Sequence, residues 1–221
     1  MTYDLVIKNA QICDGTGAPA QGGSVGVSEG RIVAIDRSLS GGKREINADG
    51  LTLAPGFIDI HTHYDAQISW DPLLTSSCWH GVTSVLMGNC GVGVAPCRSS
   101  ERGVMAWDLV NVEAMPYEVL LNGVSWEWET FPEYIKAVTR RGVALNVGFL
   151  VPLSALRLFL MGDQAATRAA NPPRWRKSCA KLSAQAPPAS RSASPSSISD
   201  TRDAHSPAAL PAATNLSRWP V

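Results

Sequence analysis

The stretch PGFIDIHTHYD, from Pro55 to Asp65, carries the clearest structural signal in this sequence. Its segment GFIDI is a short apolar run, as expected of a parallel strand that is buried on both faces. Side chains two residues apart on a strand share one face, so His61 and His63 are predicted to project together from the end of this strand. Imidazole is the commonest metal ligand among side chains. The pair is therefore a candidate metal site.

A third candidate ligand follows the next predicted strand. Residues 82–87, VTSVLM, read as a strand that leads into GNCGVG, which contains Cys90. In a (β/α) barrel the carboxyl ends of the strands converge on one face, where active sites lie. His61, His63 and Cys90 are thus predicted to meet there. Neutral imidazole and thiolate are the donors that zinc prefers.

The segments around these motifs predict an α/β fold. A short helix with Asp71 as its cap, Pro72 at its first position and Gly81 after its end would join the two strands into a βαβ unit. Residues 130–142 carry a capping box and one apolar helical face, and residues 143–151 and 154–161 read as a further strand and helix. Alternation of strand and helix is the signature of a parallel α/β fold.

The two ends of the chain differ from this middle part. Residues 3–55 read as short strands separated by Gly and polar turns, which predicts a small antiparallel sheet or sandwich. Residues 1–170 contain 12 basic and 17 acidic residues, whereas residues 171–221 contain 7 basic and 2 acidic ones. The latter segment is rich in Ser, Pro and Ala and has no sustained period, so we expect the tail to be disordered.

Several of these motifs resemble one known family. PGFIDIHTHYD resembles the first-strand signature of the amidohydrolase superfamily, and GVTSVLMGNCGVGVAPC is similar to its N-acyl-D-amino-acid deacylase (D-aminoacylase) branch. WEWETFPEYI and SALRLFLMGDQ also look like that branch. The resemblance covers about residues 1–168.

This resemblance implies a fold and a division of the chain. Residues 1–55 would be the N-terminal part of a small β-sandwich, and residues 56–168 the first strands and helices of a partial (β/α)8 metal-dependent hydrolase barrel. Residues 169–221 would be a low-complexity tail. A complete barrel of this type takes about 250 residues, so the chain is expected to hold a truncated one. The tail resembles an out-of-frame translation of a GC-rich gene, and re-reading the gene one base over tests that hypothesis.

The resemblance also implies the roles of individual residues. His61, His63 and Cys90 would bind the metal, with one or two zinc ions in the family. Asp65 is expected either to orient a ligand histidine through its second ring nitrogen or to be an ordinary solvated loop residue. We assign no catalytic acid or base, because the family takes its further histidines and its catalytic aspartate from later strands.

Three functions are consistent with the sequence. The first is a metal-dependent hydrolase of carbon–nitrogen bonds that deacylates N-acyl-D-amino acids, with a small-molecule N-acyl amino acid as substrate. The second is a catalytically inactive, truncated fragment of such an enzyme. The third is a binding module whose basic tail contacts nucleic acid or an acidic surface. The basic residues of the tail are scattered among Ser and Pro rather than clustered with aromatics, so we expect no nucleic-acid partner.

The sequence also indicates the cellular compartment of the protein. The N-terminal segment MTYDLVIKNA lacks the basic start and apolar run of a secretory signal, and five cysteines at irregular spacings do not suggest a disulfide framework. We therefore expect a cytoplasmic protein. The apolar run at residues 143–161 is interrupted by Asn146, Pro152 and Arg157. A strand followed by a helix explains it better than a membrane span does.

Overall fold

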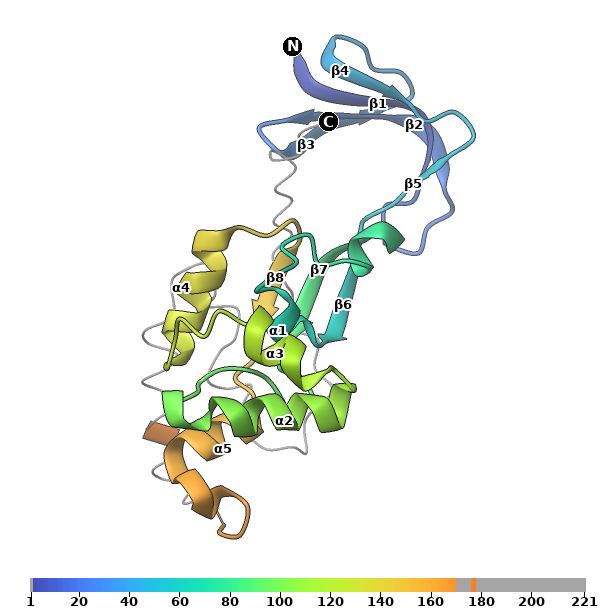
Figure 1. Cartoon of the computed structure of the whole chain (residues 1–221). Coiled ribbons are helices and arrows are strands. Elements are labelled where there is room, and N and C mark those ends of the chain that lie inside the picture. Colours follow the sequence, from blue (N-terminus) through green and yellow to red (C-terminus); the bar gives the residue numbers. More distant parts are fainter. Residues whose placement is uncertain (1, 170–175, 178–221) are drawn as a thin grey trace. The chain divides into compact units, whose positions relative to one another are not determined.

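A computed structural model describes residues 2–169 and 176–177 of the chain. These residues form two compact units, one that ends at Phe57 and one that begins at Ile58, and each is described by itself (Figure 1). The disorder predicted for residues 169–221 concerns a segment that lies almost entirely outside the described residues.

The first unit is one sheet with the strand order β3-β2-β1-β4, in which β5 also pairs with β1. Its strands are β1 (Tyr3–Ile12), β2 (Gln21–Ser28), β3 (Arg31–Asp36), β4 (Gly42–Asn47) and β5 (Thr52–Leu53). β1, β2 and β3 pair in antiparallel fashion, but β4 and β5 both run parallel to β1. The sheet is therefore mixed and not antiparallel throughout, and the alternative that it is part of a sandwich stays a prediction. After β3 the chain returns to the other side of β1 instead of adding another hairpin.

Local turn chemistry explains the hairpin between β2 and β3. Glu29 and Gly30 have φ values of 51° and 70°. Two central residues with positive φ form the type I′ turn whose twist matches that of the flanking strands. The carboxylate of Asp4 accepts a hydrogen bond from the backbone N–H of Glu29 at 2.8 Å, which helps to hold this turn. The buried apolar residues of this unit are Val6, Ala10, Val25, Val27 and Ala48.

The second unit is built on a three-stranded sheet with the order β6-β7-β8. The strands are β6 (Phe57–Thr62), β7 (Val82–Met87) and β8 (Asn146–Phe149), and β7 and β8 are parallel. The helices are α1 (Tyr64–Gln67), α2 (Arg102–Glu113), α3 (Tyr117–Gly123), α4 (Phe131–Arg141) and α5 (Leu153–Met161). Short 3-10 turns are η1 (Ser77–His80), η2 (Ser99–Glu101) and η3 (Gly162–Ala165). The described residues are thus a mixed α/β structure, as predicted.

The predicted capping box begins α4. The Thr130 hydroxyl accepts a hydrogen bond from the backbone N–H of Glu133, and the Glu133 carboxylate accepts one from the backbone N–H of Thr130 at 2.8 Å. Phe131, Ile135 and Val138 are buried, so the predicted apolar face packs into the core. The helix ends at Gly142, whose φ is 74°. This element was read correctly because its signals are local in the sequence.

The prediction of a helix after Asp71 was largely wrong. Only the short turn η1 is helical in this segment, although Gly81 does follow its end with φ at 79°. The Asp71 carboxylate accepts hydrogen bonds from the backbone N–H groups of Leu73 and Thr75 at 3.1 and 2.8 Å. Leu74 lies between them with φ at 55°. The Asp71 side chain thus stabilises a tight turn, and a left-handed residue cannot continue a helix.

The core of the second unit lies among its sheet and helices. Trp128 packs edge-on against Tyr134 with 4.8 Å between the ring centroids, and Tyr134 contacts Phe149 in the same way at 5.7 Å. The Trp128 indole N–H donates to the Val94 carbonyl at 2.9 Å, which ties the loop after β7 to the loop before α4. None of the helices among the described residues is long and apolar enough to cross a membrane.

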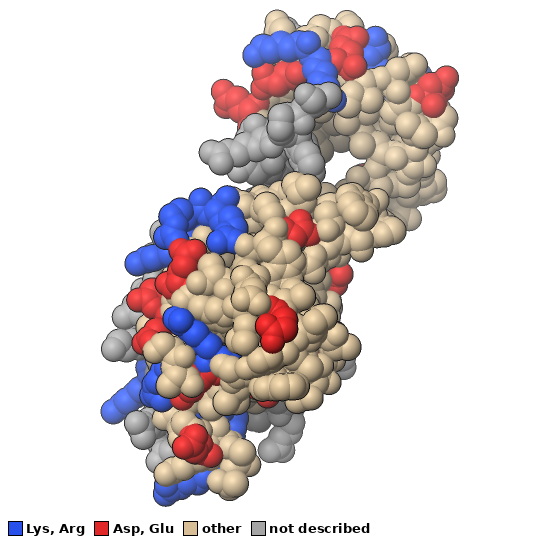
Figure 2. All heavy atoms as spheres, in the orientation of Figure 1, with Lys and Arg blue, Asp and Glu red and all other residues tan. Residues whose placement is uncertain are grey.

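Acidic and basic residues lie next to one another on the face that Figure 2 shows. Near α4 this pairing is local, because Arg140 and Arg141 both form ion pairs with Glu127. Exposed pairs of this kind contribute little to stability. At Glu127 acidic and basic side chains therefore balance one another over a short distance.

Candidate metal centre

The two histidines predicted as metal ligands, His61 and His63, lie at the carboxyl end of β6. Thr62, between them, is buried and points to the opposite side, whereas His61 is exposed and His63 is partly buried. The two imidazole centroids are 5.5 Å apart. Strand alternation thus places both rings on one side of β6, as the H-x-H spacing predicts.

Cys90 is carried by the loop that follows β7. Gly88 and Gly91 have φ values of 83° and 89°, and the Gly91 N–H donates to the Gly88 carbonyl at 3.1 Å, so the chain turns tightly around Cys90. The Asn89 side-chain amide donates to the carbonyl of Ile60 at 2.9 Å. This bond fixes the loop to β6, the strand that carries the histidines.

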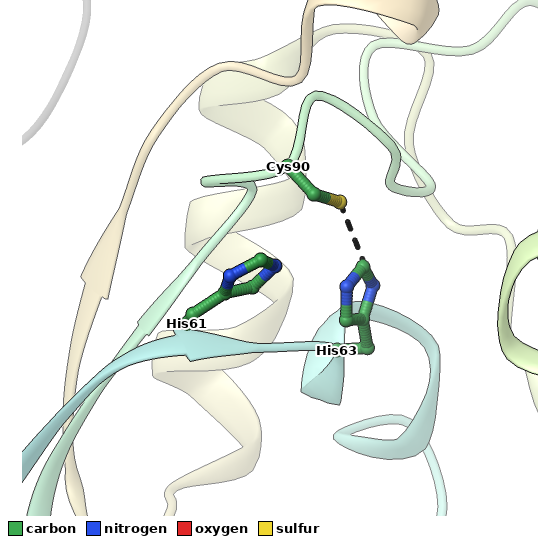
Figure 3. Close-up of side chains that lie close together, drawn as sticks. All are labelled: His61, His63 and Cys90. Carbon is green, nitrogen blue, oxygen red and sulfur yellow. Dashed lines mark hydrogen bonds between the residues drawn. The ribbon is translucent and has the colours of Figure 1, made fainter.

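The structure brings the three predicted ligands together (Figure 3). One ligand atom from each of His61, His63 and Cys90 lies within 4.8 Å of the other two. The Cys90 sulfur is 3.9 Å from Nδ1 of His63. Donors that share one tetrahedral zinc ion are separated by about 3.5 Å, given bond lengths of about 2.0 to 2.3 Å. Because the rings and the thiol stand close to this spacing on a partly open surface, these residues fit a zinc ion.

Asp65 follows the two histidines on α1 and is almost fully buried, at 3% exposure. Its backbone carbonyl accepts a hydrogen bond from the Tyr134 hydroxyl at 3.0 Å, but its Oδ2 has no hydrogen-bond partner among the described residues. Burial, and to a smaller extent the nearby Glu113 carboxylate, raises the pKa of Asp65 to about 7. No hydrogen bond joins its side chain to His61 or His63 in the described part of the chain. Its role in orienting a ligand stays a prediction.

A carboxylate that the sequence analysis missed does contact a predicted ligand. Oε1 of Glu113 lies 3.2 Å from Nε2 of His63. Glu113 is the last residue of α2, and Ala114 follows it in the left-handed conformation with φ at 53°. Nothing in the segment NVEAMP distinguishes Glu113 from an ordinary acidic residue at a helix end. Only the tertiary structure, which brings the end of α2 to the residue that follows β6, reveals the contact.

Comparison with known proteins identifies the family. A family model described as "Amidohydrolase family" matches residues 44–186, which is more than half of the chain. The match includes all three candidate ligands.

The similar curated proteins are longer than this chain. It is 37% identical over 169 residues to an N-acyl-D-aspartate deacylase of Alcaligenes xylosoxydans xylosoxydans, with 75% of this chain and 32% of that protein covered. A D-aminoacylase of the same organism is 32% identical over 162 residues, with coverages of 73% and 31%. An uncharacterized protein of Mycobacterium tuberculosis, strain H37Rv, is 36% identical over 173 residues, with coverages of 76% and 28%. The chain therefore spans about a third of the length of these relatives.

Solved structures give the same result. A crystal structure of D-aminoacylase matches with a TM-score of 0.67 and 30% identity, and the match covers 83% of this chain and 37% of that one. The N-acyl-D-glutamate deacylase of Bordetella bronchiseptica, solved with zinc and a phosphonate inhibitor, matches with a TM-score of 0.65 and 31% identity. That match covers 84% of this chain and 36% of the other. By its sequence and its fold, this chain belongs to the amidohydrolase family and resembles the N-terminal part of the D-aminoacylase branch.

Proposed function

We propose that this chain holds the first metal ligands of a hydrolase that deacylates N-acyl-D-amino acids. The observation that carries the proposal is the position of His61, His63 and Cys90, whose ligand atoms lie within 4.8 Å of one another. Zinc is the ion that this set of nitrogen and sulfur donors fits best. When bound, it would supply Lewis-acid chemistry for hydrolysis of an amide bond.

The relatives support the choice of substrate. Three of the relatives that align with about three quarters of this chain are a D-aminoacylase and two deacylases, named for N-acyl-D-aspartate and N-acyl-D-glutamate. An N-acyl-D-amino acid is a small molecule with an amide bond, and the proposed reaction releases a D-amino acid and a carboxylate. Three protein ligands with a further position open to water or substrate are the usual arrangement of a catalytic zinc site.

The surroundings of the thiol also suit a metal ligand. Cys90 is exposed, and its sulfur accepts a hydrogen bond from the backbone N–H of Val92 at 3.4 Å. Cys90 is therefore accessible to an ion from solvent, and the loop backbone holds its sulfur in place.

Metal content and turnover test the proposal together. The full chain is purified, loaded with zinc and analysed for bound metal, and release of amino acid from N-acetyl-D-aspartate, N-acetyl-D-glutamate and an apolar N-acetyl-D-amino acid is measured. We expect about one tightly bound zinc ion per chain, and Cys90→Ala should lower the affinity at least tenfold. Cys13→Ala is the matched control, because Cys13 belongs to the first unit and is not one of the three candidate ligands.

The outcomes separate the candidate functions. Turnover that depends on Cys90 supports the deacylase, and the preferred substrate identifies its side-chain class. Stoichiometric zinc without turnover supports the alternative of a metal-binding but catalytically inactive fragment. If the wild-type chain and Cys90→Ala bind zinc equally weakly, the metal centre is wrong.

A further inference from the structure

Leu153 is a large apolar side chain on the surface beside the candidate metal centre. It is the first residue of α5 and is 56% exposed, whereas Ala155 and Leu156 on the same helix are buried. A Cβ atom on Gly91 would lie 3.5 Å from the Cβ atom of Leu153. Because Gly91 directly follows Cys90, Leu153 contacts the loop at the residue next to a candidate metal ligand.

Hydrogen bonds hold the start of α5 against the loop that follows β7. The backbone N–H and the hydroxyl of Ser154 both donate to the Gly91 carbonyl, at 2.8 and 2.6 Å. Closer to the strands, the Leu150 N–H donates to the Met87 carbonyl at 2.9 Å. The chain that leaves β8 therefore runs along the chain that leaves β7, and these bonds fix the place of the first residue of α5.

Leu153 thus belongs to the same edge of the sheet as the candidate ligands. His61 and His63 lie at the carboxyl end of β6, Cys90 follows β7, and Leu153 follows β8. In parallel sheets and barrels, ligands bind outside the carboxyl ends of the strands. A substrate held at the metal centre therefore has the Leu153 side chain as a neighbour.

We propose that Leu153 is a specificity-determining residue that gives the substrate site an apolar wall. Its side chain has no hydrogen-bonding group, so it stabilises an alkyl group by removing apolar surface from water. A charged or strongly polar group at the same place would lose hydration without gaining a partner. The inference rests on the proposed deacylase function. The alkyl group that contacts Leu153 belongs either to the acyl chain or to the amino-acid side chain of the substrate.

A second exposed leucine shows why position, and not exposure alone, carries this inference. Single apolar side chains are common on protein surfaces. Leu73 is also 48% exposed, but it follows Pro72, whose carbonyl accepts a hydrogen bond from the Ala144 N–H at 2.9 Å. Ala144 precedes β8, so Leu73 lies beside the amino end of that strand, at the opposite edge of the sheet from the ligands. It therefore provides the matched control.

Binding of two series of phosphonate analogues to the zinc-loaded full chain gives the first test. Such analogues mimic the tetrahedral intermediate and are not hydrolysed, so isothermal titration calorimetry can measure their dissociation constants. One series carries methyl, propyl or pentyl on the acyl side, and the other carries the same groups as the amino-acid side chain. We expect the affinity to rise about fourfold for each added methylene in at least one series, and the series that responds identifies the part of the substrate.

Substitution of Leu153 should change this length dependence. Leu153→Asn keeps a similar size but removes the apolar surface, so the gain should fall below about twofold for each methylene. Leu153→Ala should lower the gain as well, because less apolar surface remains. Leu73→Asn should keep the gain of the wild type. A merely structural effect would weaken the short and long analogues equally and would leave the gain unchanged.

Nuclear magnetic resonance of methyl-labelled leucine gives the second test. The Leu153 signals are identified as those missing from Leu153→Ala. In the wild type, the long analogue of the responding series should shift these signals and show magnetisation transfer between its alkyl group and the Leu153 methyl groups. The Leu73 signals, identified as those missing from Leu73→Asn, should stay unchanged.

The outcomes separate failure of this inference from failure of the proposed function. If the wild type binds the analogues but Leu153→Asn keeps the same gain and the Leu153 methyl groups show no contact, the role of Leu153 is wrong and the proposed function stands. An affinity that is independent of chain length in both series overturns the apolar wall in the same way. If the wild type binds zinc but none of the analogues, the deacylase proposal is wrong and the inference falls with it. Thermal unfolding establishes that each variant is folded, and the methyl contact in the wild type keeps the test decisive should a variant unfold.

Discussion

The Thr62 hydroxyl donates a hydrogen bond to the carbonyl of Leu86 at 2.9 Å. Thr62 is buried and stands between the two candidate histidine ligands, and Leu86 lies on β7, four residues before Cys90. The bond therefore joins the strand that carries the imidazoles to the strand that leads to the thiol. Together with the bond from Asn89 to Ile60, it sets the spacing of the candidate metal centre.

Thr62→Val should destabilise the protein by about 1 to 2 kcal/mol, because it keeps the shape of the side chain and removes a buried hydrogen bond. Urea unfolding measures the change. Thr83→Val is the matched control: Thr83 is exposed on β7, and its replacement should change the free energy of unfolding by less than about 0.5 kcal/mol. Equal stabilities for the two variants would contradict the role given to this hydrogen bond.

The cysteines should differ strongly in reactivity. Cys90 is exposed, whereas Cys97 is fully buried and its burial raises the pKa of its thiol to about 12. Because the thiolate is the reactive form, iodoacetamide should modify Cys90 first and Cys97 only after unfolding. Peptide mapping by mass spectrometry identifies the modified residues. Added zinc should slow the reaction at Cys90; an unchanged rate with zinc bound elsewhere would argue against Cys90 as a ligand.

Gly88→Ala should be strongly destabilising. A Cβ atom at this position would lie 2.2 Å from the Leu150 carbonyl oxygen, and the backbone φ is 83°. Gly91 has a similar φ of 89°, but a Cβ atom at this position would lie 3.5 Å from the Leu153 side chain, which is an ordinary contact distance. We expect the Gly91 variant to lose about 1 to 2 kcal/mol from backbone strain. The Gly88 variant should lose clearly more, as measured by urea unfolding, and the reverse order would refute this steric account.

Asp65 should make the metal-free protein less stable as pH rises. Its pKa is raised from 3.8 to about 7 on folding, so the folded state binds a proton more tightly than the unfolded state. The stabilisation is fully present below about pH 4 and is lost as pH rises to about 7, a change on the order of 4 kcal/mol. Asp65→Asn removes this dependence, so its stability relative to the wild type should increase from pH 5 to pH 8.

The matched control for that prediction is Asp163→Asn, which makes the same replacement at an exposed position in η3. Chemical unfolding at pH 5, 6, 7 and 8 in the presence of a chelator provides the comparison. A difference between Asp65→Asn and the wild type that stays constant over this range would show that burial does not hold the Asp65 proton.

Where the signals are local, the sequence predicted the elements well. β7, β8, α4 and α5 appear where apolar runs, a capping box or helical periodicity place them. β6 also lies where it was predicted, but its residues Phe57, Ile58 and Ile60 are exposed, so the prediction that this strand is buried on both faces was wrong. The Asp71 segment failed because the same carboxylate that can cap a helix can also close a turn, and here it bonds to the backbone of Leu73 and Thr75. The parallel pairing of β4 and β5 with β1 was not predicted, because strand order depends on partners that are distant in the chain.

For the candidate site, the sequence was enough to predict which residues come together. The H-x-H spacing on a strand and a cysteine after the next strand are enough to predict three donors at one edge, because strand alternation and parallel pairing are general properties of the backbone. The surroundings of these donors are seen only in the folded structure. The contact between Glu113 and His63 joins the end of α2 to the end of β6. Asp65 is buried because distant elements pack around it, among them α4, whose Tyr134 donates a hydrogen bond to the Asp65 carbonyl. Contacts of this kind arise from packing between elements distant in the chain, and no short motif encodes them.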